Sequence, residues 1–165
     1  MFNKIDKLSK SEFTEVFGNI FENAAWIAEK LYEQKPFKNF QELSEKIISI
    51  FENCDQQNKF KILNSHPDLA DKTKISSLTP DSNKEQVNAK LDQCTKDEYN
   101  EFKNLNLKYK NKFGFPFIIA VKGKNKEEIL NSFRQRITNN INSEFEEAKK
   151  QVKKIANFRL SEIIK

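Results

Sequence analysis

Apolar residues recur at helical spacing along most of this chain. Phe40, Leu43 and Ile47, for example, fall on one face of a helix. With only 3 Gly and 4 Pro, the chain has too few turn-forming residues for an all-β protein, so we expect an all-α fold. The periodicity predicts helices from a cap at Ser9 or Ser11 to Phe17, and over residues 21–34, 40–51, 59–63, 83–94, 96–113, 125–139 and 143–164.

Two stretches depart from this periodicity. Residues 64–82, NSHPDLADKTKISSLTPDS, are rich in Ser, Asp and Pro, which predicts a connection with at most one short turn of helix. Residues 113–121, FGFPFIIAV, are apolar, aromatic and β-branched, which is typical of a buried strand. No partner strand is evident, yet buried backbone groups need hydrogen-bond partners. Either a short strand pairs with this run, or its amides face something else, such as a bound ligand.

The composition indicates one domain over residues 1–165. A chain of this length, 37% hydrophobic and with 15 Phe residues to fill the interior, can bury a core without disulfides or metals. It has no run of about 18 apolar residues, and its first ten residues contain no apolar segment. We therefore expect no membrane span and no secretion signal, and the terminal EIIK is not a peroxisomal tripeptide, which leaves the cytoplasm.

Metal and nucleic-acid binding are both disfavoured. One His and two Cys, Cys54 and Cys94, cannot assemble an ordinary four-ligand zinc site, and we expect the cysteines to be thiols rather than a disulfide. The net charge of +5 makes a nucleic-acid partner one alternative to consider. However, Lys alternates with Glu along the predicted helices, as in EEAKKQVKK, which is typical of solvated faces with i,i+4 pairs.

His66 is the first candidate for chemistry. It precedes Pro67, which favours an extended backbone at His66 and makes Pro67 a natural first residue of a short helical turn. His66 is then either a surface or capping residue, or a group that exchanges protons with a substrate, since histidine has an unperturbed pKa near neutrality.

Glu85 is the second candidate. Ser82-Asn83-Lys84-Glu85 fits a capping box, which would by itself account for Glu85. The same helix start would also offer backbone amides and a positive dipole end to a substrate carboxylate or amide near Ser82 to Gln86.

Arg159 is the third candidate, because it lies on an otherwise apolar helix face. Phe145, Ala148, Val152 and Ile155 step along that face, and the next step of four reaches Arg159. Its side chain either extends to water at the end of the apolar stripe or forms a partly buried ion pair.

Taken in order, these segments resemble one family. The succession SHPDLA, SNKEQ, FGFPFIIAVKG, EEIL…RI.N and E…A…VKKIANFRL, preceded by LSKSEFTEVFGNIFENAAW, is similar to the 2-oxo-4-hydroxy-4-carboxy-5-ureidoimidazoline (OHCU) decarboxylases of urate breakdown. The resemblance covers nearly the whole chain. It implies an all-α, multi-helix bundle, a homodimer, and decarboxylation of OHCU to (S)-allantoin without a metal or organic cofactor.

The resemblance also implies roles for individual residues. His66 and Glu85 match the family's catalytic histidine and glutamate. The positions that match its substrate contacts are Pro67, Ser82, Asn83, Lys84, Gln86, Phe117, Ile118, Ile119, Ala120, Val121 and Arg159.

Two positions depart from the family pattern. Ala25 stands where the family usually has proline, and Lys90 where it usually has glycine. Lys90 either reshapes the rim of the pocket or faces solvent. The main alternative to the enzyme is a catalytically silent helical ligand-binding or interaction module on the same scaffold, in which His66 is only a cap and Glu85 only a member of a capping box.

Overall fold

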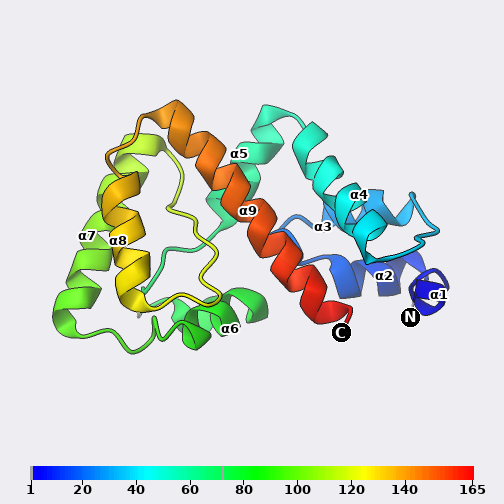
Figure 1. Cartoon of the computed structure of the whole chain (residues 1–165), viewed down its shortest axis with the longest axis horizontal. Coiled ribbons are helices and arrows are strands. Elements are labelled where there is room, and N and C mark those ends of the chain that lie inside the picture. Colours follow the sequence, from blue (N-terminus) through cyan, green and yellow to red (C-terminus); the bar gives the residue numbers. More distant parts are fainter. Residues whose placement is uncertain (1, 72) are drawn as a thin grey trace. The chain divides into compact units, whose positions relative to one another are not determined.

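A computed structural model describes residues 2–71 and 73–165, and within them the chain is helical and contains no strand (Figure 1). The predicted all-α class is therefore confirmed. None of the helices in this part of the chain is both long and apolar enough to cross a bilayer. The elements are α1 (Phe2–Ile5), α2 (Lys10–Phe17), α3 (Ala25–Tyr32), α4 (Phe40–Asn53), α5 (Gln56–Ser65), the 3-10 helix η1 (Ile75–Ser77), α6 (Pro80–Asn88), α7 (Lys96–Phe113), α8 (Lys126–Arg136) and α9 (Ile141–Ile163).

Local caps explain where several helices begin. Ser9, Thr95 and Asn125 precede α2, α7 and α8, and each accepts a hydrogen bond from the backbone N–H of a glutamate three residues later. That glutamate bonds back to the cap residue, so each start is a capping box. The predicted bounds of α7 are confirmed, because a glycine in the left-handed conformation, Gly114 at φ 78°, also ends it.

Two compact units make up the chain, and each is described separately. The first unit comprises the chain up to Ser65 together with Val152–Lys165. Helices α2, α3 and α4 pack in succession within it. Phenylalanines fill its interior, with Phe21 stacked on Phe51 at 5.0 Å between ring centroids. The last part of α9 supplies Ala156 and Leu160, both buried, to the same unit.

The second unit comprises His66–Gln151, which includes η1, α6, α7, α8 and the first part of α9. Its core is aromatic and surrounds Tyr109 on α7. Phe117, from the connection between α7 and α8, stacks on Phe133 of α8 at 3.8 Å and an interplanar angle of 8°. All the candidate residues except Arg159 lie in this second unit.

Candidate active site

His66 lies directly after the last residue of α5. Its side chain is buried, and its Nε2 atom is shielded from solvent. The next residues, Pro67 and Asp68, belong to no helix, and the backbone turns at Leu69 and Ala70. The predicted helical turn starting at Pro67 is therefore wrong. His66 is at the end of one helix rather than at the entrance of another, because α5 continues further than its weak periodicity predicted.

Glu85 lies within α6 and not at its first turn. The helix begins at Pro80, and the cap is Thr79, whose hydroxyl accepts a hydrogen bond from the Ser82 N–H at 3.4 Å. The predicted capping box from Ser82 to Glu85 is wrong, because a threonine cap followed by proline at the first helical position starts the helix three residues earlier. Capping therefore does not account for the glutamate at position 85.

Ser82, Glu85 and Gln86 occupy one face of α6, since residues three and four positions apart lie on the same side of a helix. Ser82 and Gln86 are buried, and Glu85 is half-buried. Asn83 is turned to η1, where its side chain donates to the Ile75 carbonyl at 2.8 Å, and Lys84 is exposed. The structure thus separates Asn83 and Lys84 from the buried face that Ser82 and Gln86 form.

Gln86 joins α6 to the segment that follows His66. Its Nε2 donates to the Asp68 carbonyl at 3.1 Å, and its Oε1 accepts from the Ala70 N–H at 3.0 Å. Ala70 adopts a positive φ of 57°, a conformation that side-chain-bearing residues rarely adopt without support. The buried Gln86 side chain therefore bonds the backbone on both sides of the turn. It connects the helix that carries Glu85 to the backbone two and four residues beyond His66.

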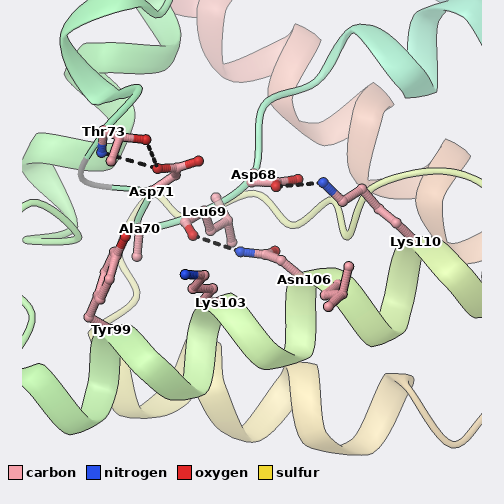
Figure 2. Close-up of a pocket in the computed structure, with 10 residues that line it drawn as sticks. Asp68, Leu69, Ala70, Asp71, Thr73, Tyr99, Lys103, Asn106 and Lys110 are labelled. Atoms are coloured by element: carbon pink, nitrogen blue, oxygen red, sulfur yellow. Dashed lines mark hydrogen bonds and ion pairs between the residues drawn. The ribbon is translucent and has the colours of Figure 1, made fainter.

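Helix α7 holds the same turn by other contacts (Figure 2). Asn106 donates to the Leu69 carbonyl at 3.0 Å, and the Lys110 ammonium pairs with the Asp68 carboxylate at 2.7 Å. Between α7 and the turn is a pocket of about 270 Å³. Neither His66 nor Glu85 lines it, so this pocket borders the turn rather than containing the candidate catalytic pair.

Residues Phe117 to Val121 form a buried connection that belongs to no strand in the described part of the chain. Side chains, and not a neighbouring strand, satisfy part of its backbone. Arg136 donates to the Ile118 carbonyl at 2.7 Å, and the Gln151 Oε1 accepts from the Ala120 N–H at 3.0 Å. The predicted strand is wrong, because these contacts replace a β-ladder for an apolar run that enters the core.

Arg136 is part of a buried polar network that sequence reasoning missed. The Glu144 carboxylate is fully buried and accepts from Arg136 at 3.0 Å and from the Tyr109 hydroxyl. Burial, and then the hydrogen bond to Glu144, raise the pKa of Tyr109 well above its ordinary value of 10.0. The sequence signal for this network is an Arg and a Glu eight residues apart at the junction of two helices. This signal is weak, because the neighbouring helices contain many other charged residues.

Arg159 lies in the first unit, where it forms an ion pair with Glu22 at 2.8 Å. Both side chains are almost inaccessible to solvent, at 4% and 2% exposure. Arg159 also donates to the Asn19 carbonyl at 2.9 Å. Of the two interpretations left open by the sequence, the buried ion pair is therefore confirmed and extension of the side chain into water is excluded.

Lys90 is exposed and adopts a positive φ of 58°, one residue beyond Ala89, which caps the end of α6. The Leu91 N–H bonds the Gln86 carbonyl and the Lys90 N–H bonds the Val87 carbonyl, both at 2.9 Å, which is the Schellman arrangement. Glycine is the preferred residue at that position, because it adopts positive φ without strain. The departure at Lys90 therefore concerns the backbone at a helix end, and its side chain faces solvent.

Comparisons with known proteins agree on one family. The model of the OHCU decarboxylase family matches residues 6–161. A 2-oxo-4-hydroxy-4-carboxy-5-ureidoimidazoline decarboxylase from Haloferax volcanii is 33% identical over 159 residues, which are 96% of this chain and 93% of that protein. One from Xenopus laevis is 33% identical over 98% of this chain and 93% of its own length.

The chain also resembles part of longer proteins. It is 41% identical, over 98% of its length, to a uric acid degradation bifunctional protein from a Bacillus species (strain TB-90), of which it spans 32%. Among solved structures it resembles an (S)-allantoin synthase with a TM-score of 0.79 and 26% identity, covering 99% of this chain and 54% of that one. An OHCU decarboxylase solved in the presence of (S)-allantoin shares the fold, with a TM-score of 0.70 at 20% identity. The chain therefore belongs to the OHCU decarboxylase family.

Proposed function

We propose that this protein decarboxylates OHCU to (S)-allantoin, with His66 and Glu85 as its catalytic residues and no metal or organic cofactor. Membership of the family supports the reaction. The observation that carries the assignment of residues is the Gln86 side chain, which links the helix bearing Glu85 to the turn that follows His66. Thr79 caps α6, so capping of the helix does not explain why a glutamate stands at position 85.

The proposed reaction breaks one C–C bond and adds one proton. The carboxylate leaves as CO₂, and the electron pair of the broken bond moves into the imidazoline ring. The ring carbon that bears the ureido group then takes up a proton, and delivery to one face yields a single enantiomer. Because the ring absorbs the electrons, the protein has only to place the substrate and move protons.

Each candidate residue has one task in this proposal. His66 exchanges a proton with the substrate hydroxyl or the reacting ring carbon, a task suited to an imidazole. Glu85 orients N–H groups of the ring or the ureido substituent. Pro67, Ser82 and the Phe117 to Val121 segment contact the substrate, with backbone amides of that segment meeting its carbonyl oxygens. Arg159 corresponds to the arginine of the family's closing motif, one of the positions that match its substrate contacts.

The test is production of optically active allantoin. OHCU is generated in situ from urate, the protein is added, and circular dichroism follows the (S)-enantiomer. General acid–base catalysis contributes about 10² to 10⁴ in rate, so His66→Asn is expected to lose roughly that factor. Glu85→Gln is expected to impair turnover, while Asp92→Asn, which removes the charge of an exposed carboxylate close by in the sequence, serves as the matched control.

Two outcomes would contradict the proposal. Near-normal turnover of fresh OHCU by His66→Asn would remove the role given to His66. Racemic allantoin formed at the uncatalysed rate by the wild-type protein would favour a silent helical module. We further propose a homodimer, on the resemblance to a family that is usually dimeric, and light scattering that reports only the mass of one chain would contradict it.

A further inference from the structure

The connection between α7 and α8 presents its backbone in a defined direction. The peptide bond between Ile118 and Ile119 is trans, since the cis bond of the described chain joins Lys35 and Pro36. In a planar trans peptide the C=O and the following N–H point in opposite directions. Because the Ile118 carbonyl is directed to Arg136, the Ile119 N–H points away from that arginine.

A second contact orients the next peptide. The Ala120 N–H is directed to the Gln151 Oε1 at 3.0 Å, so the Ile119 carbonyl in the same planar group points away from Gln151. Two side chains thus hold the peptides on either side of Ile119. In the described chain, no hydrogen bond joins the Ile119 N–H or C=O to another group. Such groups seldom remain unpaired in a buried segment, which points to a ligand.

The two holding side chains are themselves fixed. Arg136 pairs with the fully buried Glu144, and its guanidinium lies over the Phe117 ring at 4.4 Å. Gln151 donates its Nε2 to Glu147 at 2.8 Å, which leaves its Oε1 directed at Ala120. A peptide group that already forms one hydrogen bond loses little freedom when it forms a second one, so the N–H and C=O of Ile119 are oriented before any ligand binds.

We propose that Arg136 and Gln151 are positioning residues, which hold the peptides around Ile119 so that its N–H and C=O together meet a ligand edge with an adjacent N–H donor and carbonyl acceptor. Ureido, lactam and imide groups carry that edge. The inference rests on the proposed function, which identifies a substrate with a ureido group and a ring lactam. It adds two residues that touch the segment and not the substrate.

The sharpest test changes Gln151. A change at Arg136 is harder to interpret, because it also affects the buried Glu144 carboxylate that pairs with this arginine. Gln151→Leu removes the acceptor for the Ala120 N–H at similar volume. The exchange variant Gln151→Glu with Glu147→Gln keeps an acceptor at 151 and restores the bond between the two side chains. Gln135→Leu, at an exposed position of α8, is the matched control. Arg136→Lys keeps a charge beside Glu144 but lacks the fork that also reaches Ile118.

Two readouts separate positioning from mere stability. Loss of a well-placed hydrogen bond in the segment is expected to raise the KM for OHCU and the Kd for (S)-allantoin by roughly tenfold in Gln151→Leu and in Arg136→Lys, with a smaller change in kcat. The exchange variant and Gln135→Leu should match the wild type. In NMR spectra of labelled protein, (S)-allantoin at a concentration equal to the wild-type Kd should shift the Ile119 amide resonance of the wild type, and should shift that of Gln151→Leu much less.

The outcomes distinguish this inference from the proposed function. Unchanged KM and Kd in Gln151→Leu, a wild-type protein that does not bind (S)-allantoin, or binding that leaves the Ile119 amide unshifted would each overturn the positioning role. Wild-type protein that shifts the Ile119 amide on binding (S)-allantoin but turns over no OHCU would instead refute the decarboxylase assignment and support the positioning role.

Discussion

Among the described residues are two buried arginine–glutamate pairs, one in each unit, and α9 contributes a residue to each. Glu144, in the first turn of α9, pairs with Arg136, and Arg159, near the end of α9, pairs with Glu22. The two carboxylates are almost equally inaccessible, at 0% and 2% exposure. The chemistry of the two pairs is therefore the same, and their surroundings distinguish them.

The difference lies in what else each arginine binds. Arg136 donates to the buried Ile118 carbonyl, and its carboxylate partner also receives the Tyr109 hydroxyl. Arg159 donates to the Asn19 carbonyl, which is only partly buried, and its ion pair joins segments from the two ends of the chain. A buried ion pair contributes little net stability, because desolvation offsets its attraction. The comparison indicates that one pair holds a candidate binding segment and the other ties the ends of the chain together.

The largest expected effect comes from removing either cation. Arg136→Met and Arg159→Met each leave a buried carboxylate without its charge partner, which typically lowers the free energy of unfolding by about 3–5 kcal/mol. Urea unfolding of each variant and of the wild type measures this loss. Arg134→Met is the control, because its ion pair with Glu101 is solvent-exposed and such pairs contribute at most about 1 kcal/mol. A loss in either variant no larger than that of the control would show that its carboxylate is not truly desolvated.

Removing both partners should separate the two pairs. Replacing both partners of a buried ion pair by apolar residues often leaves stability unchanged. The free energy of unfolding of Arg159→Met with Glu22→Leu is therefore expected to lie within about 1 kcal/mol of that of the wild type. Arg136→Met with Glu144→Leu leaves the Ile118 carbonyl and the Tyr109 hydroxyl buried without these partners, at about 1–3 kcal/mol each. Equal stability of the two double variants, by the same urea titration, would remove the distinction drawn here.

Tyr109, which donates to Glu144, makes the stability contributed by the Arg136–Glu144 network depend on pH. Its pKa is raised in the folded protein, so above about pH 10 unfolded chains release this proton while folded ones retain it. Stability from this group is complete below that pH and declines above it, by at most about 1.4 kcal/mol per pH unit. Tyr109→Phe should lose about 1–3 kcal/mol at neutral pH and show a shallower decline between pH 10 and 11. Parallel pH profiles would contradict the assignment.

The smallest expected effect tests whether the Arg159–Glu22 ion pair is independent of the backbone at the end of α6. Lys90→Gly removes a side chain from a left-handed position and is expected to raise the free energy of unfolding by about 1 kcal/mol. Since Lys90 is exposed at the end of α6, the gain should be the same in wild type and in Arg159→Met. Unequal gains would mean that the first unit's ion pair is coupled to this helix end. Thermal and urea unfolding measure both.

The helix starts show how far local sequence patterns reach. The box from Thr95 to Glu98 has no competing start, and α7 begins where the pattern predicts. Around α6, by contrast, two start signals lie three residues apart. Thr79 followed by Pro80 competes with Ser82 followed by Glu85, and the first prevails because proline suits the first helical position. An error of three residues placed Glu85 in a cap, where its carboxylate would have been fully accounted for.

The sequence by itself determined the helical class, most helix positions, the family, and the short set of residues that includes His66, Glu85 and Arg159. Each of these depends on residues within about four positions or on motifs in order along the chain. Only the tertiary structure decided that Gln86 brackets the turn after His66, that Arg136 and Gln151 hold the peptides around Ile119, and that Glu22 receives Arg159. Those partners are remote in sequence, and their choice depends on which polar groups the packing of the helices removes from water.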